Sequence, residues 1–144
     1  MNNWTILGIQ STIGLVLYTL IFFWYVQPRL STLPFEKAVL PLLLLHVFRF
    51  AGFALLVVGQ VDPSLPRPVM SAIAYGDLLA GISALMAAIA LRGRSSLAMP
   101  LIWLFTFIGV ADIVNVGRIA ISLDLFSHDI GTMWFVSILF FPTL

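Results

Sequence analysis

Residues 69–91 of this 144-residue chain, VMSAIAYGDLLAGISALMAAIAL, are apolar along their whole length except for a few polar side chains, and Asp77 is the one charged residue among them. A helix of that length, rising about 1.5 Å per residue, crosses the roughly 30 Å hydrocarbon core of a bilayer. The whole chain is similar, with 61% hydrophobic and 9% charged residues, against about 25% charged residues in an ordinary soluble domain. This composition excludes a soluble enzyme, a disordered chain and a nucleic-acid-binding domain, and predicts an integral membrane protein.

Hydropathy and polar interruptions divide the chain into membrane segments. We expect an all-α polytopic helical bundle, a single transmembrane domain over residues 1–144, with four full spans and a short fifth. The expected spans are residues 4–26, 38–59, 69–91, 97–123 and 130–144. The fifth would reach only about 22 Å along a helix axis, so we expect a truncated span or one that ends early, with a re-entrant segment as the alternative.

The distribution of basic residues in the loops predicts an orientation. Arg29, Lys37, Arg92 and Arg94 lie in the loops after spans one and three, whereas the loop after span two holds only Arg67. Because cytoplasmic loops carry an excess of Lys and Arg, we expect the N-terminus outside and the C-terminus inside. The chain has no cysteine, which excludes disulfides and thiolate metal sites.

Several polar side chains fall inside the predicted spans. A charge at mid-membrane costs about 2.5–3.5 kcal/mol even on the lenient insertion scale. Arg49, Asp77 and Asp112 come from three spans and are expected at similar depth, with Arg49 between the two carboxylates. Asn115 and Arg118 are expected one or two turns further out, so that Arg118 brings the formal charge of the group to zero.

Small residues predict which span lies at the centre. Residues at i and i+4 share one face of a helix, and span three places small residues on such a face. They are Ala72, Gly76, Ala80, Ala84 and Ala88. Because small residues let membrane helices approach closely, we expect span three at the centre of the bundle and spans one and five at its periphery.

Three functions are compatible with this pattern. The first is a buried site that binds or conducts a small ligand, an ion or a proton, formed by Arg49, Asp77, Asp112 and Asn115, with Arg118 and Tyr75 nearby. The second is an accessory, non-catalytic subunit of a larger membrane complex, in which the ion pairs only fix the helices.

The third function is binding of haem or another tetrapyrrole through His46, with an arginine one turn away available to a propionate. The only other histidine, His128, is expected in a distant loop. No HExxH, GxSxG or P-loop motif occurs, so we expect binding or transport rather than catalysis. The expected partners are the lipid bilayer and a homo-oligomer or larger membrane complex, without nucleic acid.

Three strings in spans two to four resemble a pattern in uncharacterised small multi-span bacterial membrane proteins. They are HVFRFAG at 46–52, AYGDLLA at 74–80 and GVADIVN at 109–115. The resemblance implies the bacterial inner membrane and assigns no established function. It also implies a full final span, with its own histidine, after a string like FPTL at 141–144.

Overall fold

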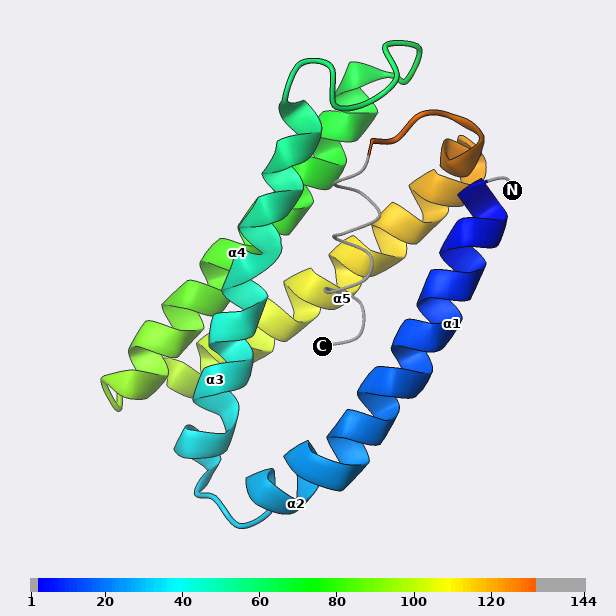
Figure 1. The fold of residues 1–144 in the computed structure, drawn as a ribbon. Helices are drawn as coiled ribbons and strands as arrows, with labels where there is room; N and C mark the ends of the chain where they lie inside the picture. Colours follow the sequence, from blue (N-terminus) through cyan, green and yellow to red (C-terminus); the bar gives the residue numbers. More distant parts are fainter. Residues whose placement is uncertain (1–2, 132–144) are drawn as a thin grey trace.

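The computed structural model describes residues 3–131 of the chain, and within this range it contains helices and loops without a β-strand (Figure 1). In chain order the elements are α1 (Asn3–Ile21), the π-helix η1 (Phe22–Val26), α2 (Gln27–Leu30), α3 (Phe35–Val47), the 3₁₀-helix η2 (Phe48–Leu56), α4 (Arg67–Arg92), α5 (Ala98–Ser122) and the 3₁₀-helix η3 (Leu125–Ser127).

The described residues form four helical stretches that are long and apolar enough to cross a membrane. They cover Asn3–Leu30, Phe35–Leu56, Arg67–Arg92 and Ala98–Ser122. The all-helical class is therefore confirmed, and the four full spans predicted from the sequence fall on these stretches with ends shifted by up to four residues. The fifth predicted segment, residues 130–144, lies outside the described residues except for its first two positions.

The first stretch is a continuous helix that changes its winding before a proline. Pro28 has no backbone N–H, and its ring conflicts with the carbonyl group four residues earlier in a regular α-helix. The wider π-turn of η1 ends at Val26, and α2 then begins with Pro28 in its first turn. In the first turn of α2 the backbone N–H of Pro28 would have no partner within that helix, so its absence costs no hydrogen bond there. The helix therefore continues to Leu30, four residues beyond the predicted end of the span.

The second stretch also changes its winding, from α to 3₁₀. It begins at Phe35, so Pro41 lies inside α3 and not in the first turn of a span starting at residue 38. In η2 the helix tightens to three residues per turn, which places every third side chain in one straight row. The buried residues of η2 are Arg49, Gly52 and Leu55, which form such a row.

The row of buried residues in η2 faces α4, which lies at the centre of the described bundle. Helix α4 contacts α3, η2 and α5 along its length, and Figure 1 shows these elements side by side. Ala80, Ala84 and Ala88 are buried there, as the small-residue pattern predicts, whereas Ala72 is exposed. The central place expected for span three is confirmed within residues 3–131.

The N-terminal helix has a different environment. Within the described part of the chain, α1 makes its main contacts with η1, which continues it, and with η3. The indole N–H of Trp4 donates to Asp124 Oδ1 at 2.9 Å, and the Trp4 ring meets Phe126 edge-on at 4.5 Å. These contacts hold the start of α1 at the end of the bundle where α5 finishes (Figure 1).

The loops lie at two opposite ends of the bundle. Arg94, after α4, and Glu36, at the start of α3, form an exposed ion pair of 3.8 Å, so the connections α2–α3 and α4–α5 share one end. Loop 57–66 and the segment after α5 lie at the other end (Figure 1). This alternation places the basic loops of the sequence at one end, which is the geometry that a charge-based orientation requires.

Candidate functional site

The central feature of the site is one arginine shared by two aspartates from neighbouring helices. Arg49 of η2 directs Nε to Asp77 Oδ1 of α4 at 3.0 Å, and Nη2 of Arg49 lies 2.9 Å from the same oxygen. Arg49 Nη2 also donates to Asp112 Oδ2 of α5. We refer to Arg49, Asp77 and Asp112 as the Arg49 cluster. It joins the three helical stretches that form the described core.

The three side chains of the cluster differ in exposure. The Arg49 and Asp112 side chains are 8% and 5% exposed, whereas the Asp77 side chain is 23% exposed. Asp112 is therefore enclosed by protein, and Asp77 is the carboxylate that can be reached from the bundle surface. Any exchange of a proton or ion with the surroundings would begin at Asp77.

Glycines of adjacent helices make room for the charged groups. A Cβ atom added at Gly52 of η2 would overlap the Asp77 carboxylate, and one added at Gly76 of α4 would overlap Asp112 Oδ1. A Cβ at Gly109 of α5 would lie 3.4 Å from Arg49 Nη1. Each charged side chain thus lies against a glycine of a neighbouring helix, which lets the helices approach without expelling the ions.

The cluster lies midway along the helices that hold it. Asp77 follows the start of α4 by ten residues and Asp112 precedes the end of α5 by ten, a distance of about 15 Å along each axis. Arg49 precedes the end of η2 by seven residues, or about 14 Å at the 3₁₀ rise of about 2.0 Å. The three depths agree, and each is about half of a 30 Å hydrocarbon core.

The remaining predicted site residues lie outside this contact. Arg118 is exposed and Asn115 is half-buried, and both line a surface hollow on α5 instead of the cluster. Tyr75 is 56% exposed, and its ring meets that of Phe53 at 5.5 Å. The expected neutral group of two arginines and two aspartates is therefore not what the structure brings together. The cause is helix rotation, because Arg118 lies six residues beyond Asp112, about 240° around an α-helix.

His46 is half-buried one turn before Arg49, where its imidazole ring lies 5.0 Å from the Phe105 ring. It contacts an aromatic side chain of α5 and does not join the Arg49 cluster. Within residues 3–131 no group of three or more histidine, aspartate or glutamate side chains is arranged to hold a metal ion. Haem ligation by His46 stays a prediction of the sequence.

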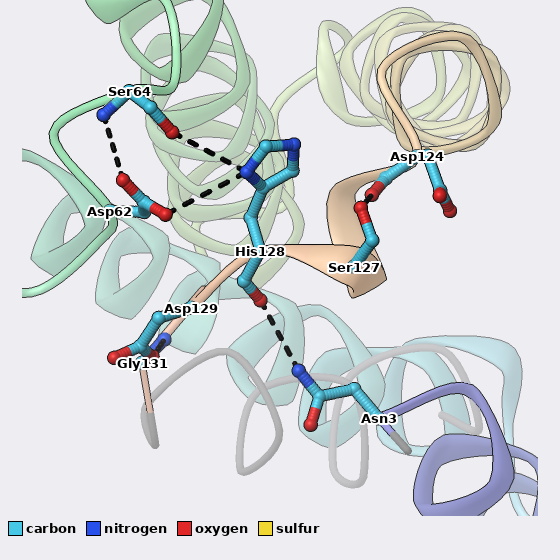
Figure 2. A network of polar contacts seen from close by, with 8 residues as sticks. All are labelled: Asn3, Asp62, Ser64, Asp124, Ser127, His128, Asp129 and Gly131. Atoms are coloured by element: carbon cyan, nitrogen blue, oxygen red, sulfur yellow. Dashed lines mark hydrogen bonds and ion pairs between the residues drawn. The ribbon is translucent and has the colours of Figure 1, made fainter.

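A second polar group, which the sequence did not predict, lies at the end of the bundle where α1 begins (Figure 2). We refer to Asn3, Asp62, Ser64 and His128 as the end-face network. The Asn3 side-chain amide donates to the His128 carbonyl at 3.2 Å. His128 Nδ1 lies 3.4 Å from the Ser64 hydroxyl and 3.7 Å from Asp62 Oδ2. Each of these contacts joins His128 to a residue more than 60 positions away. Local sequence patterns therefore could not have predicted the network.

In the end-face network, the structure lowers the pKa of the Asp62 carboxyl. The backbone N–H of Ser64 donates to Asp62 Oδ1 at 2.8 Å, and chiefly this hydrogen bond holds the pKa of the Asp62 carboxyl below its ordinary value. The nearby His128 imidazole acts in the same direction. The carboxylate form is favoured because it accepts the hydrogen bond.

Over residues 3–131, the fold and the site define a class: an all-helical protein with four helices apolar enough to span a membrane and a buried ion-pair cluster between three of them. The chain belongs to the family described as a domain of unknown function (DUF8737), whose model matches residues 6–144. No curated protein and no solved structure matches the chain.

Proposed function

We propose that the Arg49 cluster is a proton-binding site inside the membrane, and that the protein takes up and releases, or conducts, a proton there. One observation carries the proposal: a single guanidinium lies between two carboxylates at the middle of helices that are apolar enough to span a bilayer. With both carboxylates ionised, the cluster has a formal charge of −1.

An uncompensated charge in a low-dielectric interior is expensive, and such a site lowers its free energy by binding a proton or another cation. Arg118, the other basic residue expected here, is exposed on α5 and outside the cluster. The extra negative charge therefore favours uptake of one cation. Two carboxylates that share a guanidinium titrate as a coupled pair, so the bound proton belongs to the pair and not to one residue.

A proton fits this geometry better than a metal ion. The Arg49 guanidinium already donates hydrogen bonds to Asp77 Oδ1 and Asp112 Oδ2. In the described range it pairs with no acidic side chain other than these two, so few carboxylate oxygens are left for a metal ion. A hard metal ion such as Mg²⁺ or Ca²⁺ requires six or more oxygen ligands, whereas a proton requires one carboxylate oxygen. The partly exposed Asp77 provides the point of exchange.

Infrared difference spectroscopy of the protein in liposomes, stepped from about pH 6 to about pH 9, tests the proposal directly, because exposed carboxyl groups are already ionised over this range. The wild-type protein is expected to show the carbonyl stretch of a protonated carboxyl that disappears as the pH rises. Asp77→Asn and Asp112→Asn are each expected to abolish this band, because the remaining single carboxylate is neutralised by Arg49. Glu36→Gln, at an exposed position on the basic end of the bundle, is the matched control and is expected to retain the band.

Proton flux into the same liposomes, followed with an internal pH-sensitive dye, distinguishes conduction from binding alone. Flux that is present in the wild type and lost in Asp77→Asn supports a conducting site. A titrating carboxyl without flux supports binding only. If no carboxyl titrates and Asp77→Asn merely destabilises the fold, the cluster is a structural ion pair, as expected of an accessory subunit.

The cellular setting proposed for this function follows from the loop charges and the resemblance to bacterial proteins. We place the chain in a bacterial inner membrane with the basic loops in the cytoplasm. Four described helical stretches leave little room for a pathway inside one chain, so assembly into a homo-oligomer or a larger membrane complex belongs to the same proposal. Crosslinking in native membranes would identify the partner subunit.

A further inference from the structure

We propose that Arg118 and Asn115 form a binding site for the phosphate of an anionic lipid headgroup. Asn115 and Arg118 are three residues apart on one face of α5, and together with Ile119, Ile121 and Ser122 they line a surface hollow. The hollow therefore combines a cation and an amide with apolar side chains on a helix that can span the membrane.

Among the described residues, Arg118 has no counter-ion. The sequence contains six acidic residues, and all six lie in the described range, at Glu36, Asp62, Asp77, Asp112, Asp124 and Asp129. Within residues 3–131, none of them forms an ion pair with Arg118. Residues 132–144 contain no acidic side chain. None of these acidic side chains neutralises Arg118 within residues 3–131, so its guanidinium is available to an anion from outside the described residues.

The position of Arg118 favours a headgroup as that anion. Arg118 precedes the end of α5 at Ser122 by four residues, which is about 6 Å along the helix axis. From this depth an arginine side chain extends toward the membrane interface while its methylene groups stay in the apolar region. The guanidinium forms paired hydrogen bonds with phosphate oxygens.

Asn115 contributes the second donor. Its side chain is half-buried, and among the described residues it has no hydrogen-bond partner. A polar amide in an apolar setting gains free energy when it finds an acceptor. Ser122 cannot serve as a donor in the same way, because its hydroxyl donates to the Ile119 carbonyl at 3.1 Å. The specific polar contacts of the site are therefore assigned to Arg118 and Asn115.

Native mass spectrometry of the delipidated protein, titrated with phosphatidylglycerol, tests this site. Arg118→Gln is expected to weaken binding of one phosphatidylglycerol roughly tenfold, because a charge-assisted hydrogen-bond pair is lost, and Asn115→Ala is expected to weaken it by a smaller factor. Arg67→Gln is the matched control, since Arg67 is an exposed arginine at the same end of the bundle, and it is expected to bind as the wild type does.

The phosphatidylglycerol titration, repeated in the presence of inorganic phosphate, distinguishes a lipid headgroup from a free phosphate ion as the bound anion. Phosphatidylglycerol that binds in the presence of about 10 mM inorganic phosphate, far above a micromolar dissociation constant, supports a lipid site. Displacement of the lipid by inorganic phosphate would instead assign the hollow to a free anion and overturn the lipid proposal. Equal lipid binding by Arg118→Gln and the wild type would overturn it as well, as would a protein partner that copurifies only when Arg118 is present.

Discussion

The Arg49 cluster and the end-face network bring similar groups together at very different degrees of burial. In the cluster, the Arg49 and Asp112 side chains are 8% and 5% exposed and the contacts to Asp77 are 2.9–3.0 Å. In the network, the His128 and Asp62 side chains are 35% and 31% exposed and their contact is 3.7 Å. Both side chains of this network pair are thus about one-third exposed, whereas Arg49 and Asp112 are enclosed by protein and Asp77, at 23%, is the one cluster member that is partly exposed.

The contribution of an ion pair to stability therefore depends on its burial, and not only on the presence of opposite charges. An exposed pair contributes about 0–1 kcal/mol, because solvent and salt screen it. Removing one partner of a buried pair leaves a charge that nothing solvates, at a cost of about 3–5 kcal/mol. The two regions should therefore respond to mutation with effects of different size, and four predictions test this contrast from the largest effect to the smallest.

Arg49→Met should give the largest loss. It leaves the enclosed Asp112 and the partly exposed Asp77 without a counter-ion, so we expect the free energy of unfolding to fall by about 3–5 kcal/mol, measured by detergent-induced unfolding in mixed micelles. Arg94→Met is the matched control, because Arg94 pairs with Glu36 at 3.8 Å on an exposed surface. It should change stability by less than about 1 kcal/mol. Similar losses in both variants would remove the contrast between buried and exposed pairs.

Gly76→Ala should give the next largest effect. The added methyl group would occupy the space of Asp112 Oδ1, so either the carboxylate or helix α4 must move, at a cost of about 1–3 kcal/mol. Gly117→Ala on α5 is the control, because nothing lies within 4 Å of a Cβ atom at that position. It should be neutral or stabilising by up to about 1 kcal/mol, since alanine favours a helix over glycine. A neutral Gly76→Ala variant would contradict the close packing around the cluster.

Trp4→Phe should have a smaller effect. The variant keeps an aromatic ring against Phe126 and loses the hydrogen bond to Asp124 Oδ1. Because this bond is exposed, we expect a loss of about 0.5 kcal/mol, measured by the same unfolding assay. A loss as large as that of Arg49→Met would show that the start of α1 is held mainly by this contact.

The smallest effect should be the pH response of Asp62. Its pKa is lowered in the folded protein, so the ionised carboxylate contributes its full stabilisation above the unfolded value of about 3.9 and loses it as the pH falls through the lower folded value. Hydrogen exchange should show this locally, because the Ser64 amide donates to the Asp62 carboxylate.

The Leu65 amide is an internal control for that experiment, since it donates to the Asp62 backbone carbonyl at 3.1 Å, which does not titrate. As the pH falls, Ser64 should lose protection relative to Leu65. An unchanged ratio between the two amides, down to about pH 2, would show that the carboxylate does not hold the Ser64 turn.

The sequence predicted the parts of the fold and site that depend on composition and helical period. The four long apolar helices and the central position of α4 are examples. It also predicted that Arg49, Asp77 and Asp112 share one depth, because counting residues from helix ends gives depth directly. Depth alone led us to expect Arg118 beside the cluster, whereas the helical period places it about 240° around α5 from Asp112. Which side of each helix faces the cluster depends on the neighbouring helices.

Composition determined that this chain is apolar enough for a membrane, because too few polar side chains are available to cover a soluble surface, and the length of its apolar segments indicated helices. Only the tertiary structure decided which ions meet. The 3₁₀ winding of η2 places Arg49 and Gly52 in one row, and Gly52 and Gly76 admit the carboxylates of other helices. The two ion pairs of Arg49 join it to residues 28 and 63 positions further along the chain. Local sequence patterns do not extend over such distances, because they report only the faces of single helices.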